Sequence, residues 1–240
     1  MDNSNPIIHT IRPGDTLYNL AILYGTTVQD IVNANFNLNP YNLQVGQQIY
    51  IYPHPNSSDY WVSTNQVHLM ENMNLAWLEH VFWTRLFLIS VADSLDDLEA
   101  TKTRLLENPR DIANVFRKYY GNTFANNIQK LLTDHLVIGG DLIVALKNKN
   151  DKLAQELTTK CYKNADDMAV AFSNINPFYP KEEVRNMLYE HLRLTTNEVS
   201  NRLKKDYSAD IKAYGLVQKE ALQMAMFFVD GIVRQFADLF

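Results

Sequence analysis

The stretch PGDTLYNLAILYGTTV, residues 13–28, decides the fold of the N-terminal part of the chain. After the turn residues Pro13 and Gly14, apolar residues recur at helical spacing as far as Gly25, a residue type that commonly ends helices. Thr27 then begins a second helix, with Asp30 three positions later as a variant of the capping box. Short apolar segments on either side of these helices predict two strands. The expected order is therefore strand, helix, helix, strand.

These residues resemble the LysM family over the whole module. The resemblance rests on Pro13-Gly14-Asp15-Thr16-Leu17, Leu20-Ala21, Tyr24-Gly25-Thr26-Thr27-Val28, Asn35, Leu38-Asn39-Pro40, Leu43, Gly46-Gln47, Ile49 and Ile51. It implies binding of N-acetylglucosamine-containing glycans, peptidoglycan or a chitin-like polymer, in a shallow groove between two loops. The glycan-binding residues that it implies are Gly14, Asp15, Thr16, Leu17, Asn39, Pro40 and Leu43. Phe36 departs from the family, which usually has proline after the asparagine.

The composition of the chain changes near residue 53. Residues 1–53 contain a single basic residue, Arg12, and are rich in asparagine, whereas residues 61–240 are charged and have apolar residues at helical spacing. Between them, residues 54–60 have the proline, serine and asparagine content of a linker. We therefore expect a small α+β module of βααβ order at 1–53, followed by an all-α bundle at 61–240.

The helical part repeats itself at an offset of 55 or 56 residues. Three segments carry a histidine after an acidic residue: Glu79-His80-Val81, Asp134-His135-Leu136 and Glu190-His191-Leu192. Three further segments end in phenylalanine: DIANVF at 111–116, DMAVAF at 167–172 and QMAMFF at 223–228. Each repeat is long enough for two antiparallel helices. The bundle is thus predicted to consist of three αα-hairpin repeats.

The hairpins also predict which side chains face each histidine. The histidine-bearing helices are expected at 67–92, 123–147 and 181–205, and the returning helices at 96–118, 151–174 and 208–238, the first of them interrupted by Pro109. Apolar residues three and four positions away place each histidine on a core-facing stripe. Residues equidistant from a hairpin turn lie opposite each other. The predicted pairs are His80 with Asp111, His135 with Asp167, and His191 with Gln223.

Two interpretations of these histidines are open. In the favoured one, each pair is hydrogen-bonded in the core and fixes the helix register, because an unpaired buried polar group costs about 1 to 3 kcal/mol. In the other, the bundle loosely resembles ferritin-like or hemerythrin-like proteins and binds iron or manganese. Its candidate ligands are His80, Asp111, His135, Asp167 and His191, with oxygen from Glu79, Asp134, Glu190 and Glu220. The Glu-x-x-His pair of di-iron bundles is missing, so no metal and no cofactor are predicted.

Composition and charge exclude several classes of protein. The 240 residues contain 22 Lys and Arg against 27 Asp and Glu, a formal charge of −5, which argues against a nucleic-acid partner. A single cysteine, Cys161, excludes an intrachain disulfide and a cysteine-rich zinc site. The sequence contains no run of about 18 apolar residues and no typical secretory signal, so we expect neither a membrane span nor export by the usual route.

These observations favour a non-enzymatic protein of the bacterial cell wall or the spore envelope. The LysM module would bind a peptidoglycan or chitin-like glycan, and the helical domain would act as a scaffold for self-assembly or for a protein partner. The spore envelope is suggested by a wall-binding module in a chain without a recognisable secretory signal. The alternatives are a wall-tethered ferritin-like metal-binding protein or enzyme, and a structural protein of a phage tail or injection machine.

Overall fold

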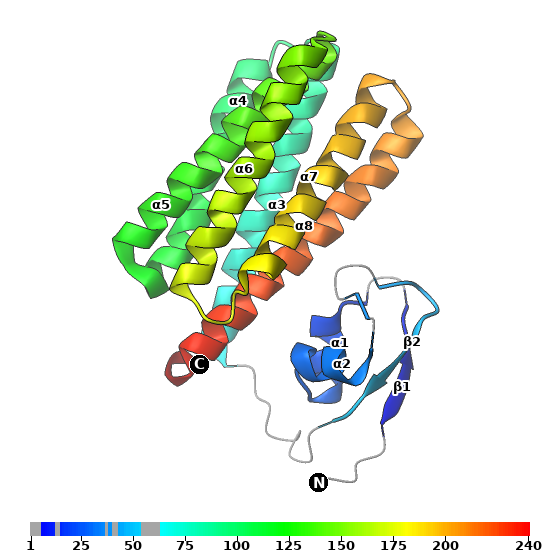
Figure 1. Cartoon of the computed structure of the whole chain (residues 1–240), viewed down its shortest axis with the longest axis vertical. Coiled ribbons are helices and arrows are strands. Elements are labelled where there is room, and N and C mark those ends of the chain that lie inside the picture. The colour runs from blue at the N-terminus through cyan, green and yellow to red at the C-terminus, as the bar shows by residue number, and fades with distance from the viewer. Residues whose placement is uncertain (1–5, 13–14, 37, 40–42, 54–62) are drawn as a thin grey trace. The chain divides into compact units, whose positions relative to one another are not determined.

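The computed structural model describes residues 6–12, 15–36, 38–39, 43–53 and 63–240 (Figure 1). The chain forms two compact units, Met1–Ser63 and Thr64–Phe240. The predicted linker, residues 54–60, lies outside the described residues. Each unit is described by itself below.

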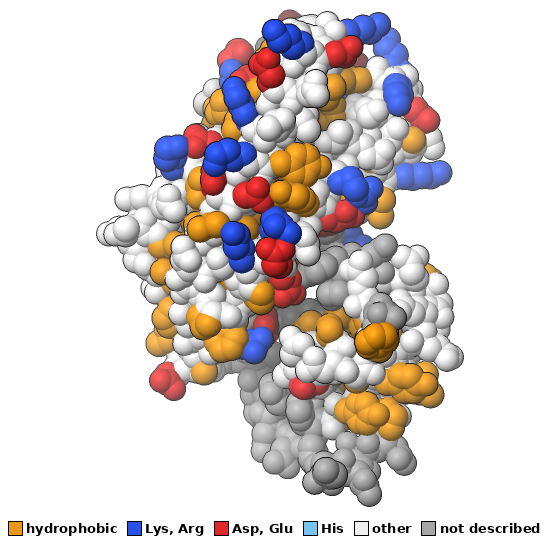
Figure 2. Space-filling view, in the orientation of Figure 1, with side chains coloured by type: hydrophobic (Ala, Val, Ile, Leu, Met, Phe, Trp, Pro, Cys, Tyr) orange, Lys and Arg blue, Asp and Glu red, His pale blue; other side chains and the backbone are white. Residues whose placement is uncertain are grey.

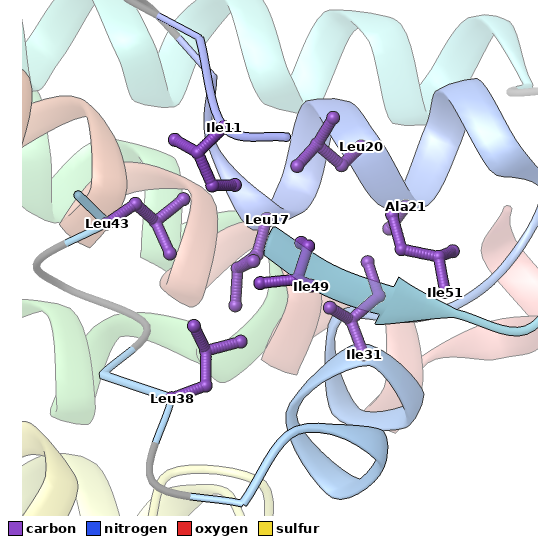
Figure 3. Close-up of a cluster of buried hydrophobic side chains, with 9 residues drawn as sticks. All are labelled: Ile11, Leu17, Leu20, Ala21, Ile31, Leu38, Leu43, Ile49 and Ile51. Atoms are coloured by element: carbon purple, nitrogen blue, oxygen red, sulfur yellow. The ribbon is translucent and has the colours of Figure 1, made fainter. Parts of the chain in front are cut away.

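The N-terminal unit has the predicted order of elements. Strand β1 (Ile7–Thr10) pairs antiparallel with β2 (Gln48–Ile51), with Ile7 opposite Ile51. Helices α1 (Leu17–Tyr24) and α2 (Val28–Ala34) lie between the strands in the chain. Nine apolar side chains from β2, both helices and the loops form one buried core, in which Ile11 directly follows β1 (Figure 3).

Local signals in the sequence explain where the two short helices begin and end. Gly25 has a φ of 58°, the left-handed conformation that a glycine adopts without strain, and the next residue closes the turn by a backbone bond to Ala21. Thr27 caps α2, because its hydroxyl accepts a hydrogen bond from the backbone N–H of Asp30. The predicted capping interaction is therefore confirmed.

The second unit is a bundle of long helices that run side by side (Figure 1). In chain order these are α3 (Thr64–Asp93), α4 (Leu98–Leu105), α5 (Asn108–Lys147), α6 (Asp151–Ile175), α7 (Lys181–Leu203) and α8 (Tyr207–Gln235), followed by a short 3-10 helix, Ala237–Leu239. The break between α4 and α5 falls where Pro109 predicts it, with this proline in the first turn of α5. The expected architecture, a small βααβ module followed by a helical bundle, is confirmed.

Helix α5 is in effect two antiparallel segments that meet at Gly121. This glycine has a φ of 76° and a ψ of −177°, which no helix accommodates. Asn108 and His135 both contact His80, although a straight helix would hold residues 27 positions apart about 40 Å from each other. The chain must therefore reverse between them, and Gly121 lies at their midpoint. The reversal makes three hairpins: α3 with α4 and the start of α5, the rest of α5 with α6, and α7 with α8.

The turns of the three hairpins are alike in detail. Ser94, Lys149 and Lys205 have positive φ values of 55°, 55° and 63°, and they are separated by 55 and 56 residues. In each turn the next residue donates a backbone hydrogen bond to the carbonyl five positions earlier, as in a Schellman motif. The same C-terminal cap is thus used three times, without glycine.

Helix α3 is long and apolar enough, by length and composition, to cross a membrane, which differs from the expectation of no membrane span. A helix in the core of a bundle passes the same test. Its polar side chains bond to other helices: His80 to α5, and Arg85 to α7 and α8. These bonds favour a core helix.

Candidate functional sites: a glycan-binding loop pair and a histidine layer

The loop before α1 is held by a buried histidine. His9 on β1, which is 7% exposed, contacts the Asp15 carboxylate through Nε2 at 2.7 Å and the Tyr24 hydroxyl through Nδ1 at 2.8 Å. The same carboxylate oxygen of Asp15 accepts a 2.7 Å hydrogen bond from the Arg12 backbone N–H. Burial opposes the charge on Asp15, but the bonds from His9 and Arg12 outweigh it and lower the pKa of this carboxyl. Asp15 thus joins His9 of β1 to the backbone at Arg12.

The other residues implied in glycan binding differ in their placement. Thr16 accepts a hydrogen bond from the Asn19 backbone at the start of α1. Leu17 and Leu43 point into the core, so they can contribute to a glycan site only through their backbone (Figure 3). Asn39 is exposed. Gly14 and Pro40 lie outside the described residues.

The three histidines of the repeat meet inside the helical unit. The ring centroids of His80, His135 and His191 are 5.8, 5.7 and 5.9 Å apart, which is close to an equilateral triangle. One potential ligand atom from each ring lies within 4.8 Å of the other two. His80 and His191 are buried, and His135 is partly buried. We call this set the histidine layer.

The predicted partners of these histidines are wrong. Asp111 lies at the surface, 3.9 Å from an Arg104 guanidinium nitrogen, and Asp167 pairs with Lys163 at 2.9 Å. The Gln223 amide nitrogen is buried and has no hydrogen-bond partner among the described residues. None of the three predicted pairs forms within this part of the chain.

The actual partners lie three residues earlier on the returning helices. The three equivalent positions, again 56 residues apart, are Asn108, Asn164 and Glu220. His80 Nδ1 is 3.0 Å from Asn108 Oδ1, and His191 Nδ1 is 2.9 Å from Glu220 Oε2. The wrong pairing has a geometric cause, because each hairpin turns one or two residues earlier than predicted. When the turn moves by one residue, the residue that faces a given histidine changes by two positions.

The two asparagines orient themselves through the backbone of the facing helix. Asn108 Nδ2 donates to the Ala76 carbonyl at 2.9 Å, and Asn164 Nδ2 donates to the equivalent Leu131 carbonyl at 3.0 Å. Their carbonyl oxygens must therefore face the histidines. In the second hairpin this bond is not completed: Asn164 Oδ1 and His135 Nδ1 are both buried and unpartnered among residues 63–240.

The three histidines of the layer differ in the direction of their pKa shifts. Burial, together with the neighbouring His191, lowers the pKa of His80 to about 4. Burial and the two other rings likewise keep the pKa of His135 well below its usual value. Burial also opposes the charge on His191, but the Glu220 carboxylate outweighs it and raises the pKa of His191. Two of the rings are therefore neutral near pH 7.

Open space adjoins the histidine layer on both sides. Towards the hairpin turns, a cavity of about 60 Å³ is lined by all three histidines and by Thr84, Gly139 and Thr195, among others. On the other side, a cavity of about 30 Å³ separates the layer from Phe172 and Phe228. A space of about 10 to 15 Å³ holds one water molecule, so the larger cavity has room for several.

Three of the four oxygen ligands of the ferritin-like alternative point away from the histidine layer. The acidic residues next to the histidines pair at the surface, Glu79 with Arg104, Asp134 with Lys130 and Glu190 with Arg193. Adjacent residues of a helix point about 100° apart, so an acid beside an inward histidine faces outward. Of the four proposed acids, Glu220 alone contacts a histidine among the described residues.

A second buried polar group was missed from the sequence. Arg85 on α3 donates hydrogen bonds to Glu198 on α7, at 2.5 Å, and to both carboxylate oxygens of Asp210 on α8, at 2.8 and 3.0 Å. Asp210 is fully buried. Burial raises the pKa of Glu198 to about 6, although Arg85 acts in the opposite direction. The cluster joins three helices, but its members have no common spacing in the sequence.

Comparison with known proteins identifies the N-terminal unit. The family model LysM domain matches residues 9–51, as the resemblance predicts. No curated protein and no solved structure gives a significant match to the chain. The match indicates binding of N-acetylglucosamine-containing glycans of the peptidoglycan or chitin type. Such domains are typical of proteins associated with cell walls.

Proposed function

We propose that this protein binds a cell-wall-type glycan through its N-terminal unit and presents its helical unit there as a non-enzymatic scaffold. The observation that carries the proposal is the LysM match over residues 9–51. The surface supports it: Figure 2 shows few charged side chains on the visible face of this unit, whereas many acidic and basic side chains are scattered over that of the helical unit. A polymer of hydroxyl and acetamide groups is suited to an uncharged surface.

Co-sedimentation of the full chain with insoluble peptidoglycan and with chitin tests the glycan proposal. We expect retention on at least one polymer and a several-fold loss of affinity in Asn39→Ala, because this exposed asparagine lies in one of the two implied loops. Asn33→Ala is the matched control, since it removes an exposed asparagine of α2 that bonds to Gln29. Retention on neither polymer contradicts the proposal.

The scaffold proposal is supported by the repetition within the bundle. Equivalent positions form the three turns, the histidine layer and its three partner positions. We infer that the helical unit is a threefold αα-hairpin repeat whose exposed faces are available for self-assembly or for a partner protein. Sedimentation velocity of the full chain, with and without soluble glycan fragments, tests self-assembly. If the chain is monomeric at all concentrations, self-assembly is excluded and the scaffold would have to bind a partner protein.

The spore envelope is our more specific prediction for the location. A fluorescent fusion expressed in a sporulating host is expected to collect around the forming spore. A uniform signal along the vegetative wall indicates the general cell wall instead, and recovery in purified virions favours the phage-structural alternative.

A further inference from the structure

Three imidazole rings from three hairpins approach one point inside the helical unit. Their potential ligand atoms lie within 4.8 Å of one another, so some point lies within about 2.8 Å of all three. Zinc binds imidazole nitrogen at about 2.0 to 2.1 Å. Each ring would therefore move by less than about 1 Å to coordinate a common ion, which small side-chain rotations achieve.

The hydrogen bonds of the layer fix which nitrogen is available in two of the rings. Asn108 directs its Oδ1 at His80, because its Nδ2 is engaged by the Ala76 carbonyl. An oxygen acceptor requires the proton of His80 on Nδ1, which leaves a bare lone pair on Nε2. The Glu220 carboxylate places the proton of His191 on Nδ1 in the same way. In both rings Nδ1 is thus engaged by an oxygen, and Nε2 is the nitrogen that a metal ion would bind, displacing any proton from Nε2 of His191.

We propose that His80, His135 and His191 bind one divalent transition-metal ion of the zinc type. Neutral imidazole suits such ions, and Glu220 supplies a compensating negative charge beside His191. Three protein ligands leave a fourth coordination position for water. The cavity of about 60 Å³ beside the layer has room for that water.

The unfinished bond of the second hairpin supports this interpretation over simple packing. His135 Nδ1 and Asn164 Oδ1 correspond to the bonded atoms of His80 and Asn108, yet both are buried without a partner in residues 63–240. A packing role alone would favour closing this bond. An ion on Nε2 of His135 would hold the ring so that Nδ1 donates to Asn164, completing the third tautomer-fixing contact.

Titration of the untagged full chain, stripped of metal with a chelator, tests the proposal with Co²⁺ as a probe. We expect the visible absorption bands of four-coordinate Co²⁺, saturation at about one ion per chain, and their loss when Zn²⁺ displaces Co²⁺. X-ray absorption of the Zn²⁺ form is expected to show nitrogen neighbours at about 2.0 Å. Absence of these bands in the native chain overturns the proposal, and so does zinc without a nitrogen shell.

Variants locate the ion. His80→Gln, His135→Gln and His191→Gln are each expected to abolish the bands, whereas His68→Gln, which removes an exposed histidine of the same helix α3, leaves them unchanged. Glu220→Gln keeps the band shape but weakens affinity about 10- to 100-fold, as loss of a carboxylate behind a metal-bound histidine does. If the histidine variants do not fold, Glu220→Gln decides. Unchanged affinity in that variant contradicts the proposal.

Discussion

The core of the helical unit contains two neighbouring layers with the same threefold arrangement and different chemistry. In the histidine layer the ring centroids are 5.7 to 5.9 Å apart, and cavities adjoin both faces. In the layer formed by Phe116, Phe172 and Phe228, which we call the phenylalanine layer, the centroids are 4.4 to 5.5 Å apart and every ring is buried. The phenylalanine rings fill their layer by contact with one another, whereas the histidine layer has open space on both of its faces.

The comparison shows that the repeat determines where three equivalent side chains meet, and that the residue type determines what the resulting layer can do. Phenylalanine fills its layer by contact, so that layer contributes stability directly. Histidine at the same symmetry brings three nitrogen atoms together at the cost of burying polar groups. We therefore expect substitutions in the phenylalanine layer to act on stability, and substitutions in the histidine layer to act on stability, acid response and ion binding.

The largest expected effect is that of Phe228→Ala. Its ring contacts those of Phe116, Phe172, Trp77 and Tyr179, at centroid distances of 5.5, 4.4, 5.4 and 5.2 Å. We expect the free energy of unfolding to fall by about 3 to 5 kcal/mol, measured by denaturant titration.

Phe82→Ala is the matched control for this substitution. Phe82 is 49% exposed on α3, so its removal should change stability by no more than about 0.5 kcal/mol. Equal losses in the two variants would show that the phenylalanine layer is not a closed core.

The sequence predicted that histidine and phenylalanine recur at equivalent positions of the repeat, but neither their meeting in layers nor the partners of the histidines on the returning helices. The recurrence of histidine and phenylalanine at 55 or 56 residues needs no knowledge of the turns, and the LysM unit carries strong local signals such as Gly25. The hairpin turns lack such a signal, because Ser94, Lys149 and Lys205 take the left-handed position that glycine usually marks.

A signal for the correct partners is nevertheless present in the sequence. The gapless alignment of residues 104–116 with 160–172 places Asn108 on Asn164, an identity that points to a shared role. Glu220 occupies the same position in the third copy. The Arg85 cluster leaves no comparable trace, because its partners come from a single place in the bundle rather than from three equivalent ones.

The second prediction concerns acid sensitivity of the histidine layer. The pKa of His80 is about 4 in the folded chain and about 6.5 when unfolded, so the unfolded chain binds more protons between these values. The stability that neutral His80 supports is therefore lost as the pH falls from about 6.5 to 4. His135 acts in the same direction, whereas His191 and Glu198, whose pKa values are raised, act in the opposite one.

His80→Gln isolates this contribution. Denaturant titrations at pH 7 and pH 4 should show that the intact chain loses on the order of 3 kcal/mol more than the variant over this interval. His68→Gln should follow the intact chain, because this histidine is exposed. The same pH dependence in the intact chain and in His80→Gln would show that His80 is not held neutral by burial.

A smaller effect separates two equivalent asparagines. Asn108→Ala leaves both the Ala76 carbonyl and His80 Nδ1 without a partner, and we expect a loss of about 2 to 3 kcal/mol. Asn164→Ala leaves one carbonyl, that of Leu131, and should cost roughly 1 kcal/mol less. Thermal and denaturant unfolding of the two variants, both in metal-free protein, measures the difference. Equal losses would mean that His135 and Asn164 are bonded without an ion.

The smallest expected effect probes the cavity beside the histidine layer. A Cβ atom added to Gly139 would have no described atom within 4 Å, other than its chain neighbours and the nearby backbone of its own helix. The same holds for Gly215 on α8. Alanine favours a helix by up to about 1 kcal/mol over glycine, so both Gly139→Ala and Gly215→Ala should raise the free energy of unfolding by up to that amount. Gly139 differs from Gly215 in lining the cavity of about 60 Å³. If Gly215→Ala stabilises the chain while Gly139→Ala destabilises it, the methyl group at position 139 displaces ordered solvent or an ion's water from the cavity. That result would show that the cavity holds solvent for the histidine layer and is not a packing defect.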